Sequence, residues 1–531
     1  MKLKKNINLD KLRGGFYTPE TITKFILAWA FNGNKFCDIL EPSCGDGAFL
    51  KSLKKGKYSF NSVTAIEYYK EEAQKAQKVT LQNTKVIISD FHKYCNTTSQ
   101  KFDIVIGNPP YIRYQYFDKE QQQEALKIFK KNNIKYSKLM NSWSAFVVGC
   151  TNLLNDNGKL AFVLPSEILQ VINAKVIREF LLKQYSKISI VSFKKLVFEK
   201  IQQDVILLLC QKGSTEPHLE YIEVEDDKAL EYIDLYKIKN PTKCIYSSEK
   251  WTMYFLEQKE LDFLHKIENN QNFSKLSEYL KVEVGMTTGG NDFFTVDKNT
   301  IDKFELKRYA KPLLGRSVQV KGCNFTREDW LNNQINQSKA NLLLFPSKQK
   351  IKSKKSLEYL SIGENNGVSS GFKCRIRNEW QIIPSANISD AFFSRRNSIY
   401  AKMILNSAQA YCTDTMHRIW FNKGVNIKAL IASYYNSITF AFVELAGRTF
   451  GGGALELMPS EVASLYVPYC TENEMLFEKI NQMLRSNCEI NEILDFTDKK
   501  ILKENLLLSS EDIELAKHIR QKLLNKRINR K

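Results

Sequence analysis

The sequence has few of the features that mark secreted, membrane-spanning or zinc-binding proteins. Its apolar runs are all much shorter than the roughly 18 residues that a membrane-spanning helix requires. The basic N-terminus has no apolar segment behind it, so we expect no secretion signal. The 11 cysteines include no Cys-x-x-Cys pair, a spacing that argues against a zinc site and fits reduced thiols in a cytoplasm. We therefore predict a cytoplasmic protein with no membrane partner and no bound metal.

Acidic residues are also scarce relative to basic ones. The chain has 78 Lys and Arg against 58 Asp and Glu, which gives a formal charge of +20. Such an excess favours a polyanionic partner such as nucleic acid, with binding that weakens as salt rises. A Lys-rich proteome would produce the same excess, so charge alone leaves both interpretations open.

A chain of 531 residues is long enough for two or three domains. Its first 240 residues alternate short apolar strands with helical patterns, which is typical of a doubly wound α/β domain. The last two of these strands have no long helix between them, so we expect them to pair antiparallel at the sheet edge. The predicted strands are 37–40, 62–66, 84–89, 104–106, 159–164, 188–193 and 204–210, and the predicted helices are 19–30, 48–55, 70–78, 142–154 and 175–183.

Other segments give weaker patterns. Residues 118–138 are polar, with a helix expected over 119–131, and fit either a mobile flap or a solvated surface helix. Residues 213–252 indicate a connector, after which a second domain mixes loops with strands, among them 342–345 and 438–443. The tail, 514–531, has the pattern of a basic amphipathic helix; we favour a solvated end helix over one that contacts phosphate.

The turn Asn108-Pro109-Pro110-Tyr111 is the most informative stretch of the chain. It follows a short apolar strand and glycine, and its two prolines restrict their own backbone and that of the residue before each. The turn can hold an amide, the Pro109 carbonyl and an aromatic face in a fixed relation. Asn108 and Pro109 could accept both hydrogens of an exocyclic amine while Tyr111 stacks on its ring. A rigid strand-to-loop turn is the alternative.

Carboxylates stand at the ends of the three preceding strands. Glu41 begins the loop Glu41-Pro42-Ser43-Cys44-Gly45-Asp46-Gly47, which lacks both the G-x-G-x-x-G fingerprint and a Walker lysine, so phosphate binding is not favoured. Glu41 would suit a cationic ligand group, and Glu67 could accept both hydroxyls of a ribose. Asp90 could accept an adenine N6 hydrogen while Phe91 packs on the ring. Each alone fits an ordinary strand end, but their succession before the turn indicates one site.

These motifs resemble those of S-adenosylmethionine-dependent DNA adenine-N6 methyltransferases, in particular the gamma class (TaqI-like) of restriction-modification systems. Phe16-Tyr17-Thr18-Pro19-Glu20 is similar to the family's first cofactor motif. Residues 142–168 resemble the segment behind the pocket, and Val197-Phe198-Glu199 resembles the segment whose aromatic ring touches the extruded base. Segments 284–294, 373–377, 413–418 and 447–456 resemble a target-recognition domain.

The resemblance implies a Rossmann-like seven-stranded methyltransferase domain over residues 1–240, followed by a mixed α/β DNA target-recognition domain over 241–531. It implies that Asn108, Pro109 and Tyr111 are catalytic residues. The same three residues and Phe198 are the implied contacts of the target base. The implied DNA-binding residues are Arg375, Arg377, Arg418 and Arg448. The implied S-adenosylmethionine-binding residues are Tyr17, Thr18, Pro19, Glu41, Pro42, Ser43, Cys44, Gly45, Glu67, Tyr68, Asp90, Phe91, Asn108 and Pro110.

The expected chemistry needs neither a metal nor a covalent intermediate. The turn would aim the amine lone pair at the cofactor methyl, and the target adenine would have to leave the duplex stack. Methylation of a protein glutamine or an RNA base, and a vestigial DNA-binding subunit, stay as alternatives. We expect a monomer and no cleavage activity, because the first motif begins by Phe16 and leaves no room for an N-terminal nuclease domain. Whether a separate cognate restriction endonuclease is a partner stays open.

Overall fold

The computed structural model describes residues 18–33, 35–56, 58–112, 117–135, 140–198, 204–213, 218–233, 250–450 and 452–529, except for the side chain of residue 450. The chain forms two compact units, each described by itself. Unit 1 consists of residues 1–258 with 450–452 and 529–531, and unit 2 of residues 259–449 and 453–528.

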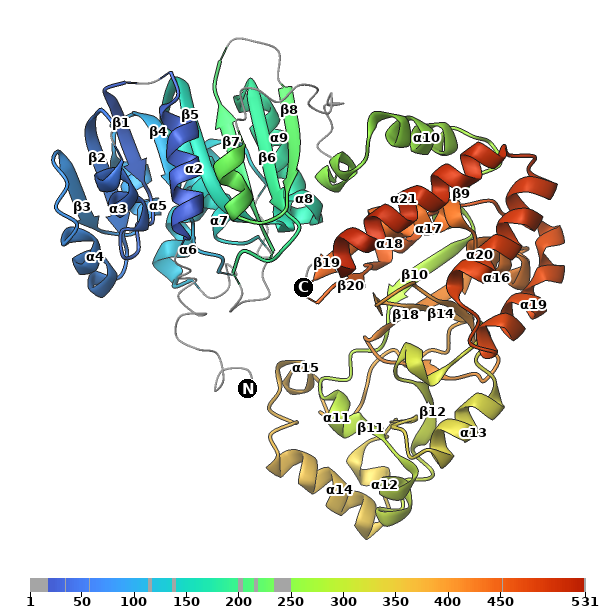
Figure 1. Cartoon of the computed structure of the whole chain (residues 1–531). Helices are drawn as coiled ribbons and strands as arrows, with labels where there is room; N and C mark the ends of the chain where they lie inside the picture. Colours follow the sequence, from blue (N-terminus) through green and yellow to red (C-terminus); the bar gives the residue numbers. More distant parts are fainter. Residues whose placement is uncertain are drawn as a thin grey trace. The chain divides into compact units, whose positions relative to one another are not determined.

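Unit 1 is built on an eight-stranded sheet in the order β3-β2-β1-β4-β5-β7-β6-β8 (Figure 1). The first five strands of this order pair in parallel, and β7 runs antiparallel to both of its neighbours. The strands are β1 (Cys37–Glu41), β2 (Phe60–Glu67), β3 (Thr84–Ile88), β4 (Phe102–Gly107), β5 (Leu154–Pro165), β6 (Lys187–Phe193), β7 (Val205–Gln211) and β8 (His218–Val224). The α/β class and all seven predicted strands are therefore confirmed.

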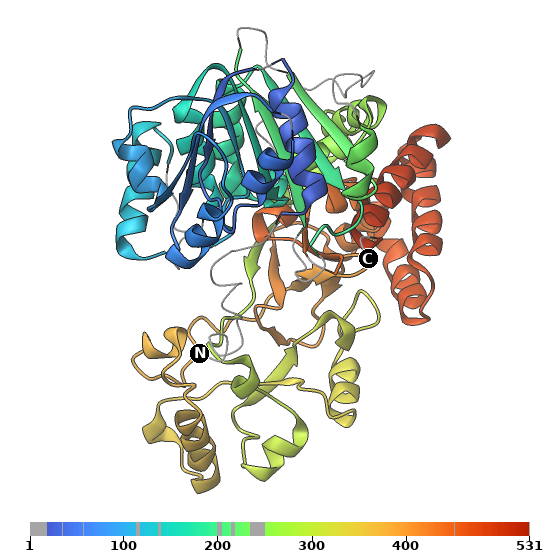
Figure 2. The same ribbon diagram turned by 60° about the vertical axis from the view of Figure 1, so that its left-hand side comes forward.

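The sheet is covered by helices on both faces, as Figure 1 and Figure 2 show. Along β5, Leu160, Phe162 and Leu164 point into one apolar core, and Ala161 and Val163 point into the other. Burial on both faces explains the continuous apolar runs of these strands. The helices are α2 (Glu20–Phe31), α3 (Ala48–Lys55), α4 (Lys70–Gln77), α5 (Phe91–Thr97), α6 (Lys119–Lys131), α7 (Trp143–Leu153), α8 (Glu167–Gln170) and α9 (Lys175–Gln184).

Strand β8 corrects the predicted connector over residues 213–252. It pairs in parallel with β6, so the antiparallel pair β6 and β7 is confirmed but does not form the sheet edge. Its alternating charged residues hid the strand: Glu220 is buried, receives a hydrogen bond from Ser189 and pairs with Lys187. The rest of the predicted connector lies partly outside the described residues.

Unit 2 contains two four-stranded sheets, in the orders β10-β18-β14-β16 and β11-β13-β12-β17. The first is antiparallel throughout, and the remaining strands form smaller ribbons. The strands are β9 (Ser274–Lys275), β10 (Leu280–Val284), β11 (Thr295–Val296), β12 (Ala310–Leu314), β13 (Asn341–Leu343), β14 (Ala391–Ser394), β15 (Arg396–Asn397), β16 (Met403–Leu405), β17 (Tyr411–Cys412), β18 (Met416–Phe421), β19 (Arg448–Phe450), β20 (Ala454–Glu456) and β21 (Tyr466–Val467).

Helices make up most of the C-terminal part of unit 2, where they are red in Figure 2. Among the described residues, no single helix has the length and apolarity of a membrane span; α16 and α17 pass that test only as a pair, bent by 76°. The helices are α10 (Gln258–Glu268), α11 (Asn291–Phe294), α12 (Lys298–Lys303), α13 (Arg327–Ile335), α14 (Lys354–Asn365), α15 (Phe372–Arg375), α16 (Ile427–Tyr434), α17 (Ser437–Ala446), α18 (Pro459–Ala463), α19 (Glu474–Arg485), α20 (Ile490–Thr497) and α21 (Ser510–Ile528).

Two predictions for unit 2 are wrong. Residues 438–443 lie in helix α17 instead of a strand, because Asn436 caps the helix N-terminus by accepting the Thr439 amide hydrogen, and a short apolar run cannot by itself separate strand from buried helix. The tail forms the predicted amphipathic helix, α21, but the helix is not a solvated end helix, because it packs against α17 and turns Arg527 inward onto Glu444 at 2.7 Å.

Candidate functional site

The sheet order brings together the four strand ends at which the sequence predicted a site. Strands β3, β2, β1 and β4 are consecutive neighbours. The loop after β1 is tied to β2 because the Cys44 amide donates to the Ile66 carbonyl at 2.9 Å. The same loop meets β4, since a Cβ added to Gly107 would lie 3.4 Å from Pro42 Cδ. The predicted residues therefore share one edge of the sheet, where open α/β sheets bind ligands.

The loop after β1 depends on glycine. Gly45 and Gly47 have φ angles of 52° and 85°, a left-handed backbone that side chains disfavour. The Gly45 amide donates to the Glu67 carboxylate at 2.9 Å, which links the first loop to the end of β2. The Cys44 side chain belongs to the buried core, so this residue can offer a ligand only its backbone.

Glu41 is a buried carboxylate whose negative charge is not compensated. Its side chain is 2% exposed, and Oε2 has no hydrogen-bond partner among the described residues. Burial, with further contributions from Glu67 and Asp46, raises the pKa of Glu41 well above its ordinary value. A cationic ligand group beside Oε2 would relieve this cost, so the residue fits the ammonium or sulfonium of S-adenosylmethionine.

Glu67 differs from Glu41 because the backbone supplies its partners. Its two carboxylate oxygens accept the amide hydrogens of Gly45 and Tyr69, both at 2.9 Å. Burial still raises the pKa of Glu67, against the opposing effect of these hydrogen bonds. Each carboxylate oxygen has a second lone pair, so the group remains able to accept hydroxyls of a ribose.

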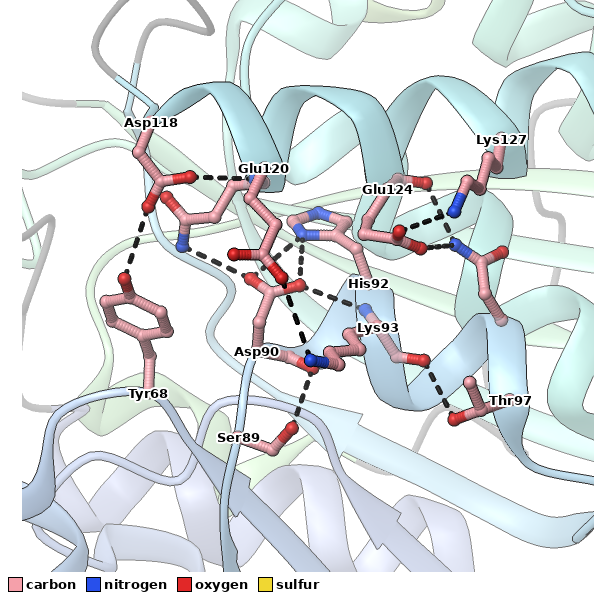
Figure 3. Close-up of polar contacts among 12 residues, drawn as sticks. Tyr68, Ser89, Asp90, His92, Lys93, Thr97, Asp118, Glu120, Glu124 and Lys127 are labelled. Atoms are coloured by element: carbon pink, nitrogen blue, oxygen red, sulfur yellow. Dashed lines mark hydrogen bonds and ion pairs between the residues drawn. The ribbon is translucent and has the colours of Figure 1, made fainter.

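Asp90 is the centre of a polar network between α5 and α6 (Figure 3). It caps α5 by accepting the Lys93 amide hydrogen at 3.0 Å, and it lies 3.3 Å from His92 Nδ1. Gln121 Nε2 donates to Asp90 Oδ2 at 3.1 Å. Burial raises the pKa of Asp90, but the hydrogen bonds from His92, Lys93 and Gln121 outweigh it and lower the pKa overall. Asp90, the predicted acceptor for the adenine amine, therefore already accepts a hydrogen bond from the side-chain amide of Gln121.

Helix α6 reaches the predicted adenine-binding residues through its first turn. Asp118 caps the helix and accepts the Tyr68 hydroxyl hydrogen at 3.2 Å, as Figure 3 shows. The inner face of α6 is buried through Ala125, Ile128 and Phe129, and its other residues are exposed or partly exposed, as in an amphipathic surface helix; residues 136–138 lie outside the described part. Phe91 is 2% exposed and stacks on Phe146, so its ring faces the core and only its backbone borders the site.

The Asn108 amide is held at both ends. Its Nδ2 donates to Thr18 Oγ1 at 3.2 Å, and the Tyr111 hydroxyl lies 2.7 Å from its Oδ1. The Ser43 hydroxyl donates to the Asn108 backbone carbonyl, which joins the turn to the loop after β1. The Pro109 carbonyl accepts no hydrogen bond from the described residues. One fixed amide oxygen and one carbonyl without a donor match the two acceptors predicted for an amine.

The two predicted aromatic partners of a base are turned inward. The Tyr111 hydroxyl lies 3.0 Å from the Val163 carbonyl, and its ring packs against both cores of unit 1. Phe198 is 9% exposed and belongs to one of these cores. Sequence reasoning missed Ser142, whose hydroxyl contacts the Pro110 carbonyl and accepts the Ile112 amide hydrogen. The sequence placed Ser142 only at the start of the predicted helix 142–154 and of the segment 142–168, without a role of its own.

The segments of unit 2 that resemble recognition motifs also converge. The Met286 amide donates to the Cys412 carbonyl, and Asn291 Nδ2 donates to Asp414. Three of the four predicted DNA-binding arginines have partners: Arg377 donates to the Thr287 and Trp380 carbonyls, Arg418 pairs with Glu283, and Arg448 pairs with Glu461. Arg375 is exposed and has no such partner in the described part of the chain.

Some residues of the predicted motifs cannot be placed in the structure. Tyr17, Glu199 and Gly451 lie outside the described residues. Pro19 precedes α2 and Thr18 contacts Asn108, so the described part of the first motif touches the turn. The described residues hold no group of three or more His, Cys, Asp or Glu side chains that could bind a metal ion.

Comparison with known proteins extends this picture over most of the chain. The model of the Eco57I restriction-modification methylase matches residues 21–198, and that of the C-terminal domain of Type II methyltransferase M.Eco57I matches residues 248–502. Type II methyltransferase M.AccI of Acinetobacter calcoaceticus is 23% identical over 86% of this chain and 86% of its own. A tRNA1(Val) (adenine(37)-N6)-methyltransferase of Haemophilus influenzae is 29% identical over 27% of this chain and 61% of its own.

The fold has a counterpart among solved structures. A cryoEM structure of a DrdV–DNA complex matches 90% of this chain and 58% of that one, with a TM-score of 0.51 and 11% identity, a likeness of fold alone. S-adenosylmethionine is the expected cofactor of such a methylase, and the uncompensated Glu41 carboxylate fits it. With both parts of the chain matched by models of one enzyme type, the protein belongs to the Eco57I-type family of Type II restriction-modification DNA methyltransferases.

Proposed function

We propose that the protein transfers the methyl group of S-adenosylmethionine to N6 of an adenine in duplex DNA, and that the adenine leaves the base stack to reach the site. The observation that carries this proposal is the pair of acceptors on the turn after β4. One is Oδ1 of Asn108, whose side-chain amide contacts Thr18 through Nδ2 and Tyr111 through Oδ1; the other is the Pro109 carbonyl, which receives no hydrogen from the described residues. The partial similarity to an enzyme named for adenine-N6 methylation supports the choice of atom.

The two acceptors would act on the amine before it attacks. An exocyclic adenine amine is a weak nucleophile because its lone pair is delocalised into the ring. Hydrogen bonds from its two N–H groups to Asn108 Oδ1 and the Pro109 carbonyl would favour a pyramidal nitrogen and orient its lone pair. Because both acceptors are fixed by the turn, they need no reorganisation when the bonds form.

The cofactor would be held by the ends of β1, β2 and β3. Glu41 would hold its cationic group, Glu67 its ribose hydroxyls and Asp90 its adenine amine. When bound, S-adenosylmethionine supplies an electrophilic methyl group. The low exposure of Glu41 and Glu67 keeps water from competing for these contacts. Tyr111 would stack on the extruded base while its hydroxyl keeps the contact with Asn108, and Phe198 would stack on the base after turning from its inward position.

Labelled methyl transfer to unmethylated duplex DNA, followed by nucleoside analysis for N6-methyladenine, tests the proposal. Asn108→Ala should reduce the rate of methyl transfer about 10²- to 10³-fold, the usual effect of removing one preorganised hydrogen bond to the reacting group. Asn152→Ala, on α7 in the same unit, serves as the matched control and should leave the rate unchanged. Methylcytosine as the product, equal transfer to RNA of the same sequence, or an unaffected Asn108→Ala variant would refute the proposal.

A further inference from the structure

Unit 2 displays an exposed apolar pair on the short helix α15. Phe372 is 65% exposed and Ile376, which follows the last residue of the helix, is 62% exposed. Four residues apart on one helical turn, they lie on the same side, together with Arg375. Cys374, on the opposite side, is fully buried. We call residues 367–377 the α15 turn; Figure 1 shows α15 near α11 in unit 2.

The α15 turn is fixed at its base by the segment 287–289. Cys374 Sγ contacts the Thr288 carbonyl at 3.8 Å, and a Cβ added to Gly289 would lie only 2.7 Å from that sulfur. Gly289 has a φ of 87°, so both its backbone and this close approach require glycine. Arg377 clamps the other side by donating to the Thr287 carbonyl at 3.0 Å. A rigid base therefore holds two apolar side chains out in water.

The charged residues within the α15 turn are all basic, and the flanking Glu364 and Glu379 have partners of their own in Lys348 and Gln381. Residues 365–378 contain three basic residues and no acidic residue. Arg377 is used at the base, whereas Lys373 and Arg375 are exposed, and Lys373 Nζ lies 5.8 Å from the centre of the Phe372 ring. An aromatic ring flanked by exposed cations is complementary to stacked bases between phosphates.

We propose that the α15 turn is a wedge that enters duplex DNA, with Phe372 inserted between adjacent base pairs and Lys373 and Arg375 on the flanking phosphates. This inference rests on the proposed action on duplex DNA. Apolar side chains that wedge into a base step partly unstack and kink the duplex. Rigidity favours this role, because the wedge then loses little conformational freedom on binding. The sequence pointed only to the arginines here; the exposure of Phe372 and Ile376 identifies the apolar part.

Duplex binding by the whole protein tests the wedge, measured by fluorescence anisotropy at several salt concentrations. Phe372→Ala should weaken binding about ten- to a hundredfold, the effect of losing one stacked ring, without changing the salt dependence. Phe372→Trp should restore it. Arg375→Ala should instead lower the slope of log affinity against log salt by about 0.9, the share of one phosphate contact. Ile335→Ala, at an apolar residue that is 74% exposed elsewhere in unit 2, is the matched control.

A second measurement separates the wedge from other uses of the same surface. 2-Aminopurine placed along the duplex should brighten at an unstacked step with the wild type and lose this signal with Phe372→Ala. Unchanged affinity and fluorescence in Phe372→Ala would overturn the wedge. A wild type that sediments as an oligomer, together with a Phe372→Ala variant that sediments as a monomer, would also overturn it, because the surface would then be a contact between copies of the chain. If the wild type binds and unstacks DNA but methylates no adenine, the proposed function fails while the wedge stands.

Discussion

Removing two of the contacts that hold the Asn108 amide tests how strongly its orientation affects methyl transfer. Tyr111→Phe deletes the hydroxyl 2.7 Å from Oδ1, and Thr18→Val deletes the acceptor 3.2 Å from Nδ2. Each hydrogen bond contributes about 0.5–1.5 kcal/mol, so each single change should lower the methyl-transfer rate at saturating cofactor by about 2- to 12-fold. Both contacts orient one amide, so we expect the double variant to lose more than the product of the two single effects.

The assay is single-turnover methyl transfer at saturating cofactor and DNA, with the four proteins arranged as a double-mutant cycle. Because the contacts act on the base acceptor, the affinity for S-adenosylhomocysteine should change little in Tyr111→Phe. A double variant whose loss equals the product of the single losses would refute the shared-amide argument. A Tyr111→Phe enzyme faster than the wild type would show instead that the hydroxyl competes with the target amine for Asn108.

Three further changes follow from the buried charges. Glu41→Gln should abolish the stabilisation that S-adenosylhomocysteine gives in a thermal melt. The same change should make the ligand-free protein about 1 kcal/mol more stable at neutral pH, because stability is commonly given up at functional sites. A bound cation should lower the raised pKa of Glu41, so cofactor affinity measured by calorimetry should rise with pH through that pKa, and an affinity that does not change with pH would contradict this. Gln121→Ala removes a donor from Asp90 and should tighten cofactor binding about 2- to 12-fold by the same hydrogen-bond magnitude, whereas weaker binding would mean that Gln121 itself contacts the cofactor. Arg527→Ala leaves Glu444 buried without its partner and should lower the free energy of unfolding by about 3–5 kcal/mol in denaturant melts; a loss below 1 kcal/mol would mean that water reaches the pair.

The strands of unit 1 could be predicted because each is an apolar run buried on both faces. The same reasoning failed for β8 and α21, where buried charged residues depend on partners from other parts of the chain. Strand β8 carries Glu220, which is buried beside its neighbour His218 and against Lys187 and Ser189 of β6, and these partners on another strand are not visible along the chain. In α21 the inward direction of Arg527 likewise depends on Glu444, more than 80 residues away in sequence.

The recognition-like segments illustrate the limit for side-chain roles. From the sequence, Arg375, Arg377, Arg418 and Arg448 were equal candidates for contacts with phosphate. The structure separates them, because Arg377, Arg418 and Arg448 already have partners within unit 2, whereas Arg375 is exposed beside Phe372. Composition cannot distinguish a cation that holds a fold together from one that meets a ligand, since both need the same residue.

The three carboxylates of the proposed cofactor site show the same limit. In the sequence they are equivalent, yet Glu41 has an oxygen without a partner in the described part of the chain, Glu67 accepts two backbone amides, and Asp90 accepts from the Lys93 amide and the Gln121 side chain and lies beside His92. Their pKa values accordingly move in different directions: burial and neighbouring carboxylates raise that of Glu41, burial raises that of Glu67, and hydrogen bonds lower that of Asp90. Neutral hydroxyl and amine groups can add to carboxylates that already have donors. A buried carboxylate that has no donor is relieved most by a cation, so we propose Glu41 as the residue that contacts the positive part of the cofactor.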